Sequence, residues 1–157
     1  MNILDIIAKK RDSKELTKQE IEYFVEGYTK GTVIKNSKNK GTISGNRYTG
    51  GIVGTTNGTV ENCVNEGNVV STAGYAGGIA SEITTSATIT NCINTANIES
   101  KTGLMIGGIV GYANGSTDAS VNNCISLGTV SSAATGDTLG SIIGSITRGK
   151  IINCYGI

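Results

Sequence analysis

Residues 50–69 read GGIVGTTNGTVENCVNEGNV, and three later segments of the chain repeat this pattern. The copies are GGIASEITTSATITNCINTANI (77–98), GGIVGYANGSTDASVNNCISLGTV (107–130) and the shorter GSIIGSITRGKIINCYGI (140–157). A partial copy, VIKNSKNKGTI (33–43), comes first and has Ser37 where the other copies have cysteine. Repetition at a nearly fixed period is typical of solenoids and propellers, in which one structural unit is stacked on itself.

The residue types indicate strands, because the copies combine β-branched residues and glycine in short apolar runs that polar turns divide. The four cysteines are 29, 32 and 30 residues apart, whereas a propeller blade usually takes about 40 residues and recurrent aromatics. We therefore predict a mainly β protein, a parallel β-helix (β-solenoid) of about four to five coils. Each coil is expected to hold a GGIVG strand, a TVENCVN strand and a GNV strand, with loops at 55–59, 70–76, 99–106 and 112–120.

The composition excludes several classes of function. The 157 residues include 23 Gly but no Pro, Trp or His, and only one Phe. Absence of histidine removes the most frequent general base and metal ligand. A net charge of +1 argues against a nucleic-acid partner, and no stretch reaches the length of a transmembrane helix.

Two positions recur in register and form the candidate sites. Equivalent residues in successive coils lie about 4.8 Å apart, so the cysteines are expected to form an interior column of free thiols. Disulfides between neighbours or a metal site are the alternatives, although the paired C-x₂-C spacing of zinc sites is absent. The residue before each cysteine is asparagine, which predicts an asparagine ladder at a left-handed bend. The predicted structural ladder comprises Cys63, Cys92, Cys124, Cys154, Asn62, Asn91, Asn123 and Asn153.

No catalytic, cofactor-binding or metal-binding residue is predicted. Residues 144–150, GSITRGK, approach a phosphate-binding P-loop, but Ile151 stands where the Mg²⁺-binding Ser or Thr is required. The acidic residues of the repeats do not recur at one repeat position. A carbohydrate-active solenoid, which clusters acids on one face, remains a less favoured alternative.

The first 31 residues are a different kind of sequence, since they carry 12 of the 25 charged side chains. Apolar residues at helical spacing predict two short amphipathic helices, at about 2–11 and 18–30. Thr17 and Glu20 form a capping box at the start of the second helix. We therefore divide the chain into a helical segment, 1–31, and a solenoid, 32–157, on which the helices could act as an end cap.

Residues 5–31, DIIAKKRDSKELTKQEIEYFVEGYTKG, resemble the opening of pyrimidine-nucleoside and thymidine phosphorylases. The resemblance implies the first two helices of the small α domain, which contributes to dimer contacts in that family. It ends at Gly31, and the family's Lys-His-Ser-Thr-Gly-Gly phosphate-binding stretch has no counterpart here. No catalytic residue is carried over, and we expect no enzyme activity. The alternative function is a catalytically incomplete fragment related to these glycosyltransferases, which act on pyrimidine nucleosides and phosphate.

Residues 33–157 resemble GLUG-motif repeat proteins of bacterial surfaces and secretions. This resemblance implies a non-enzymatic structural or adhesive module, with a glycan or a host or cell-surface protein as its expected partner. It also implies an extracellular or cell-surface location, whereas the N-terminus lacks the features of a signal peptide and as written indicates a cytoplasmic one. The last copy stops partway, and the uncapped coil is a candidate for self-association.

Overall fold

The computed structural model describes residues 9, 12, 14–19, 33–115 and 118–157. The chain divides into two compact units, Met1–Thr32 and Val33–Ile157. The two helices predicted at about 2–11 and 18–30 fall almost wholly outside the described residues, and those that are described contain no complete helix. The account of the fold therefore concerns the second unit.

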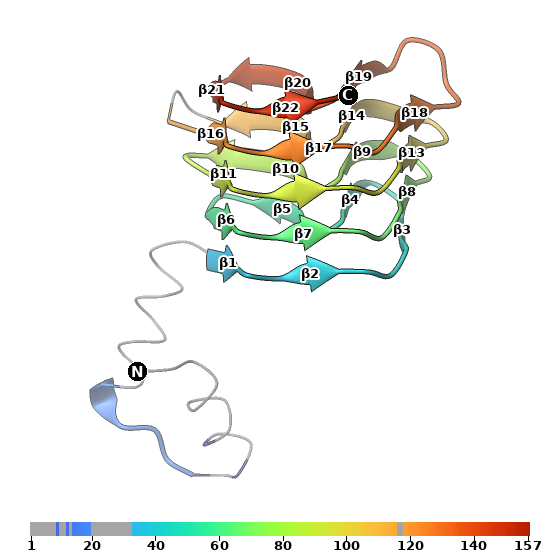
Figure 1. The fold of residues 1–157 in the computed structure, drawn as a ribbon. Coiled ribbons are helices and arrows are strands. Elements are labelled where there is room, and N and C mark those ends of the chain that lie inside the picture. The colour runs from blue at the N-terminus through green and yellow to red at the C-terminus, as the bar shows by residue number, and fades with distance from the viewer. Residues whose placement is uncertain (1–8, 10–11, 13, 20–32, 116–117) are drawn as a thin grey trace. The chain divides into compact units, whose positions relative to one another are not determined.

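Residues 33–157 form a parallel β-solenoid in which successive strands pass through five sheets and return to the first (Figure 1). Every strand pair is parallel, and each strand pairs with the strand five places further along the chain, as β1 does with β6. The described strands make four turns, and β21 and β22 begin a fifth. The expected fold class is therefore confirmed.

Two five-stranded sheets meet at the bend that precedes each cysteine. The first contains β1 (Val33–Lys35), β6 (Thr59–Glu61), β11 (Thr88–Thr90), β16 (Ser120–Asn122) and β21 (Lys150–Ile152). The second contains β2 (Lys38–Asn39), β7 (Val64–Asn65), β12 (Ile93–Asn94), β17 (Ile125–Ser126) and β22 (Tyr155–Gly156).

Three four-stranded sheets complete each turn. The third sheet contains β3 (Ile43–Gly45), β8 (Val69–Ser71), β13 (Ile98–Ser100) and β18 (Val130–Ser132). The fourth contains β4 (Tyr48–Gly50), β9 (Gly74–Gly77), β14 (Gly103–Gly107) and β19 (Thr138–Gly140). The fifth contains β5 (Val53–Thr56), β10 (Ala80–Thr85), β15 (Val110–Gly115) and β20 (Ile143–Arg148).

The expectation of three strands per coil is wrong, because each turn holds five. The TVENCVN segment is divided by the bend at Asn62, and the supposed loop 70–76 contains the end of β8 and the start of β9. The Gly-Gly pair does not begin a GGIVG strand: its first glycine ends a strand of the fourth sheet, as Gly77 ends β9, and a turn follows. A Cβ atom on Gly77 would lie 1.9 Å from the carbonyl oxygen of Ala80. Only glycine permits this close approach of the backbone to itself.

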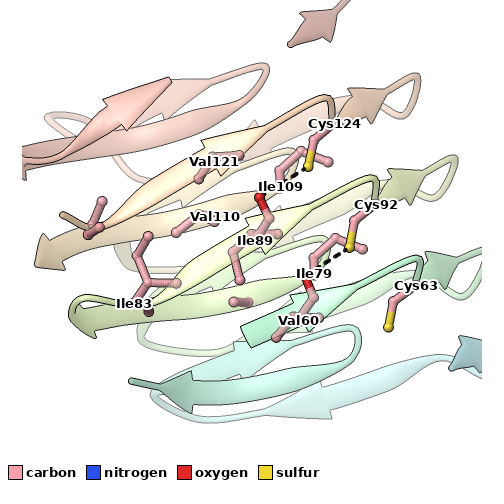
Figure 2. Packing of buried hydrophobic residues seen from close by; sticks show 14 residues of the cluster. Val60, Cys63, Ile79, Ile83, Ile89, Cys92, Ile109, Val110, Val121 and Cys124 are labelled. Carbon is pink, nitrogen blue, oxygen red and sulfur yellow. Dashed lines mark hydrogen bonds between the residues drawn. The ribbon is translucent and has the colours of Figure 1, made fainter. Parts of the chain in front are cut away.

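Aliphatic side chains and cysteines make up two hydrophobic cores, neither of which contains an aromatic residue among the described residues. The main core packs the first sheet against the fifth around Ile79, Ile89 and Ile109, all 0% exposed (Figure 2). A smaller core of Val69, Ala76, Ile98 and Ile106 lies between the third and fourth sheets. Stacking of like residues in register buries both cores, since each turn covers the apolar surface of its neighbour.

Candidate functional site

The cysteines form one column along the main core, at the bend between the first and second sheets (Figure 2). Cys63, Cys92 and Cys124 are buried, Cys154 is half-buried, and all four are free thiols. Each thiol donates to a carbonyl of the preceding turn: Cys92 Sγ lies 3.6 Å from the oxygen of Val60. The column is therefore a set of sulfur contacts that link adjacent turns.

Burial and hydrogen bonds between neighbouring thiols shift the pKa values in this column in both directions. Removal from water raises the pKa of the Cys63 thiol above its ordinary value of 9.0. The adjacent Cys92 thiol, together with burial, raises the pKa of Cys124. Because the thiolate is the reactive form, Cys63 and Cys124 are poorly suited to nucleophilic chemistry. The hydrogen bond with the Cys124 thiol lowers the pKa of Cys92, but this side chain is fully buried.

The asparagine before each cysteine has a left-handed backbone. Its φ angle is 54°, 52°, 51° and 50° at Asn62, Asn91, Asn123 and Asn153, respectively. Asparagine tolerates this conformation better than other non-glycine residues. Among these side chains the structure records one hydrogen bond, in which Asn123 Nδ2 donates to Asn91 Oδ1 at 3.3 Å. These exposed asparagines therefore form the bend mainly through their left-handed backbone conformation and not through side-chain hydrogen bonds.

A second polar column, which the sequence analysis missed, lies in the interior and consists of Asn39, Asn65, Asn94 and Ser126, each two residues after Ser37 or a cysteine. Asn39 Nδ2 donates to Asn65 Oδ1, and Asn65 Nδ2 donates to Asn94 Oδ1, both at 2.8 Å. Asn94 Nδ2 lies 3.5 Å from Ser126 Oγ in the next turn. Asn65 and Asn94 are fully buried, so the amides satisfy one another without water. The available signal was a second asparagine three residues after the first, which recurs in the first three copies at Asn39, Asn65 and Asn94.

Glycines on the opposite wall make room for this interior column. A Cβ atom on Gly51 would lie 2.5 Å from Asn65 Cγ, and one on Gly78 would lie 2.5 Å from Asn94 Cγ. The second glycine of each Gly-Gly pair is thus required by a side chain more than a dozen residues away.

A row of tyrosines on the surface is another feature that the sequence analysis missed. The ring centroids of Tyr48 and Tyr75 are 5.5 Å apart with planes at 62°, and those of Tyr75 and Tyr112 are 5.4 Å apart at 51°. The guanidinium carbon of Arg47 lies 5.7 Å from the centroid of Tyr48. At the other end, the hydroxyls of Tyr112 and Thr147 are 2.8 Å apart.

Charged residues do not gather into a catalytic or metal-binding cluster within the described ranges. No group of three or more Cys, Asp or Glu side chains there could hold a metal ion. Glu61 pairs with Lys35 at 2.6 Å and Glu66 with Lys38 at 2.5 Å, which links the first two turns. Residues 144–150 lie along β20 and at the start of β21, not in a phosphate-binding loop before a helix.

Comparison with known proteins gives two unconnected similarities. The sequence profile of the GLUG motif matches residues 45–70, which lie within the first two turns. A pyrimidine-nucleoside phosphorylase of Staphylococcus epidermidis is 67% identical over 33 residues, 21% of this chain and 8% of that enzyme. The enzymes of Geobacillus stearothermophilus and Bacillus subtilis are each 54% identical over 33 residues. No solved structure matches.

These similarities agree with both resemblances inferred from the sequence. The chain spans only 8% of the length of the first curated relative, so the matched segment carries little of that enzyme. The GLUG match and the solenoid fit a repeat module and support no catalytic function. In the part of the chain that the structure describes, no helix is long and apolar enough to cross a membrane.

Proposed function

We propose that residues 33–157 form a non-enzymatic structural and adhesive repeat module of a bacterial cell-surface or secreted protein. The observation that carries this proposal is that the interior side chains form hydrogen bonds between successive turns of the solenoid. Its polar and sulfur groups bond from turn to turn, as Asn65 does with Asn94 and Cys92 with Val60. Such a solenoid holds its outer faces rigid along its length, which suits a spacer or a binding surface.

The proposal is tested by combining a search for adhesion with a search for turnover. Beads coated with the 157-residue chain are passed over surfaces bearing glycans or host-cell proteins, with beads carrying heat-unfolded chain as the control. Retention of the folded chain alone, without release of products from glycans, is the expected result. Product release would replace the adhesive proposal with a carbohydrate-active one, and equal retention of unfolded chain would remove the role of the solenoid.

The alternative is a catalytically incomplete relative of pyrimidine-nucleoside phosphorylase. Its support is the identity over 33 residues, together with the resemblance of residues 5–31 to helices that contribute to dimer contacts in that family. It predicts no phosphorolysis of uridine by this chain, but association with a complete bacterial phosphorylase in native mass spectrometry. Ile21→Asp should abolish the association, whereas a substitution in the solenoid such as Thr95→Asp should not.

The edge of the last described turn supports self-association as a further proposal. Ile151 is 47% exposed, although its register partner Val121 is 0% exposed. Tyr155 and Ile157, at 59% and 66%, extend the same apolar edge. An unpaired strand edge with apolar side chains is a template for pairing with another chain.

A further inference from the structure

We propose that the surface row of Tyr48, Tyr75 and Tyr112 is an oligosaccharide-binding strip. The inference rests on the adhesive role proposed above and assigns it to a place on the solenoid. The row crosses three turns: Tyr48 and Tyr75 are register partners in the fourth sheet, and Tyr112 follows in the fifth. It therefore crosses successive turns and passes from the fourth sheet to the fifth between Tyr75 and Tyr112.

The first argument is where this chain places its aromatic rings. The whole sequence has six Tyr and one Phe, and the two cores contain no aromatic side chain. Three tyrosines are gathered instead on the outside, where Tyr48 is 43% exposed and the other two are half-buried. Their rings are inclined at 62° and 51°, so they are held by edge contacts and not stacked flush. Packing of the interior therefore does not account for them.

The second argument is the polar chemistry beside the rings. Arg47 lies against Tyr48, and Glu82 occupies the position one turn before Tyr112 in the register of the fifth sheet. Neither Arg47 nor Glu82 forms an ion pair within the described residues. A planar cationic donor and a carboxylate acceptor thus remain available next to an aromatic row.

Sugars match this combination of groups. A pyranose ring has a face of C–H groups, which packs on an aromatic ring, and a rim of hydroxyls, which bonds to charged or hydroxyl side chains. In the fifth sheet, Glu82 has Thr55 as its register partner one turn earlier, and Ser145 follows Tyr112 one turn later. A linear oligosaccharide along the axis would meet one rung about every 4.8 Å.

A protein partner fits the same surface less well. Stable protein interfaces bury about 800 Å² on each side and have a centre depleted of charge. Here the rings form a single row, and Arg47, Glu82 and hydroxyl groups flank it directly. We therefore assign the row to a glycan, and binding of a protein alone becomes an outcome of the test.

The experiment applies the complete chain to a printed array of neutral, amino-sugar and uronic-acid hexasaccharides. Titration calorimetry follows with the hexasaccharide that is retained best. We expect binding, a loss of about tenfold or more for Tyr75→Ala, and retention within about threefold for Tyr75→Phe, which keeps the ring. Tyr155→Ala is the matched control, because Tyr155 is exposed on the second sheet, away from the row.

Circular dichroism establishes whether each variant is folded. If Tyr75→Ala does not fold, Arg47→Ala provides a second variant, because the Arg47 side chain is exposed. An unchanged affinity for the folded Tyr75→Ala or Arg47→Ala chain would overturn the strip. So would the absence of glycan binding by the unaltered chain, or retention of proteins only. These results would leave a structural solenoid intact, whereas hydrolysis of the hexasaccharide would contradict the non-enzymatic function itself.

Discussion

Ser141 faces Gly156 in the last described turn, where a Cβ atom on Gly156 would lie 2.6 Å from Ser141 Cβ. The earlier turns have the reverse arrangement: Gly78 faces Asn94, and Gly108 faces Ser126, whose Oγ would lie 2.1 Å from an added Cβ. One wall of the interior therefore carries Gly78, Gly108 and Ser141, and the facing wall carries Asn94, Ser126 and Gly156, so that each pair includes a glycine. The wall that contains Gly78 must be glycine wherever its counterpart is asparagine or serine.

Gly78→Ala should therefore be strongly destabilising. Its Cβ atom would lie 2.1 Å from the carbonyl oxygen of Gly108 as well as against Asn94, and neither group can retreat from a stacked turn. We expect a loss of about 3 kcal/mol in the free energy of unfolding, measured by urea denaturation. Gly41→Ala is the control, since its nearest atom lies 3.9 Å away; equal losses would contradict the argument.

Replacing Ser126 by glycine should rescue only part of the damage of Gly108→Ala. The double change removes the contact with Ser126 Oγ, but the carbonyl oxygen of Ser141 would still lie 2.1 Å from the new Cβ. A double-mutant cycle on the free energy of unfolding should give a favourable coupling of about 0.5–3 kcal/mol with incomplete recovery. Full recovery would mean that the carbonyl contact imposes no constraint, and zero coupling would mean that the two walls are independent.

The interior amide column makes Asn94→Ala costly for a different reason. The substitution removes the acceptor of Asn65 Nδ2 and leaves a buried N–H group without a partner. An unsatisfied buried polar group costs about 1–3 kcal/mol in the free energy of unfolding, to which the vacated volume adds. Asn57→Ala, at an exposed turn position, serves as control and should change the urea midpoint little. A midpoint shift no larger than that of Asn57→Ala would show that the column does not stabilise the fold.

The sequence predicted the period and the parallel solenoid because the same residue types recur in register from copy to copy. It did not predict five strands per turn, because strands of two or three residues are defined by bends such as Asn62 and by Gly-Gly turns. The tyrosine row could not be predicted either. Tyr75 and Tyr112 occupy different positions of the repeat and meet only because adjacent turns bring two sheets together.

The left-handed bends give a prediction in which glycine outperforms alanine. Asn91 has a φ of 52° and an exposed side chain, so Asn91→Ala should cost about 1–2 kcal/mol in the free energy of unfolding. Asn91→Gly should cost less, since glycine adopts this backbone conformation without steric penalty. Thr95→Ala, at a nearby exposed position, is the control. If Asn91→Gly were the more damaging change, side-chain hydrogen bonding rather than backbone conformation would be the main role of this asparagine.

Raised thiol pKa values predict that the solenoid weakens in alkali. For Cys63 and Cys124 the folded pKa lies above the ordinary 9.0, so the folded chain holds protons that the unfolded chain releases. Their contribution to stability is complete below pH 9.0 and declines as the pH rises above it. The lowered pKa of Cys92 acts in the opposite direction, and we expect the two raised thiols to outweigh it. The urea midpoint should therefore fall as the pH rises above about 9, and less steeply for Cys124→Ala than for the unaltered chain. A flat profile would contradict burial of the thiols, and identical slopes would exclude Cys124 as a source.

Exposure along β21 predicts association that a single charge prevents. Ile151 continues the buried column of Val60, Ile89 and Val121 but is 47% exposed, because within the described residues β21 has a strand neighbour on one side only. Light scattering after size exclusion should therefore show a mass that increases with concentration for the unaltered chain. For Ile151→Lys the mass should stay that of a monomer, because a lysine on a strand edge opposes pairing. Leu104→Lys is the matched control, because Leu104 is 58% exposed but lies on β14, away from this edge. A monomeric unaltered chain at all concentrations would remove self-association from the proposals, and loss of association in both variants would assign it to general surface hydrophobicity.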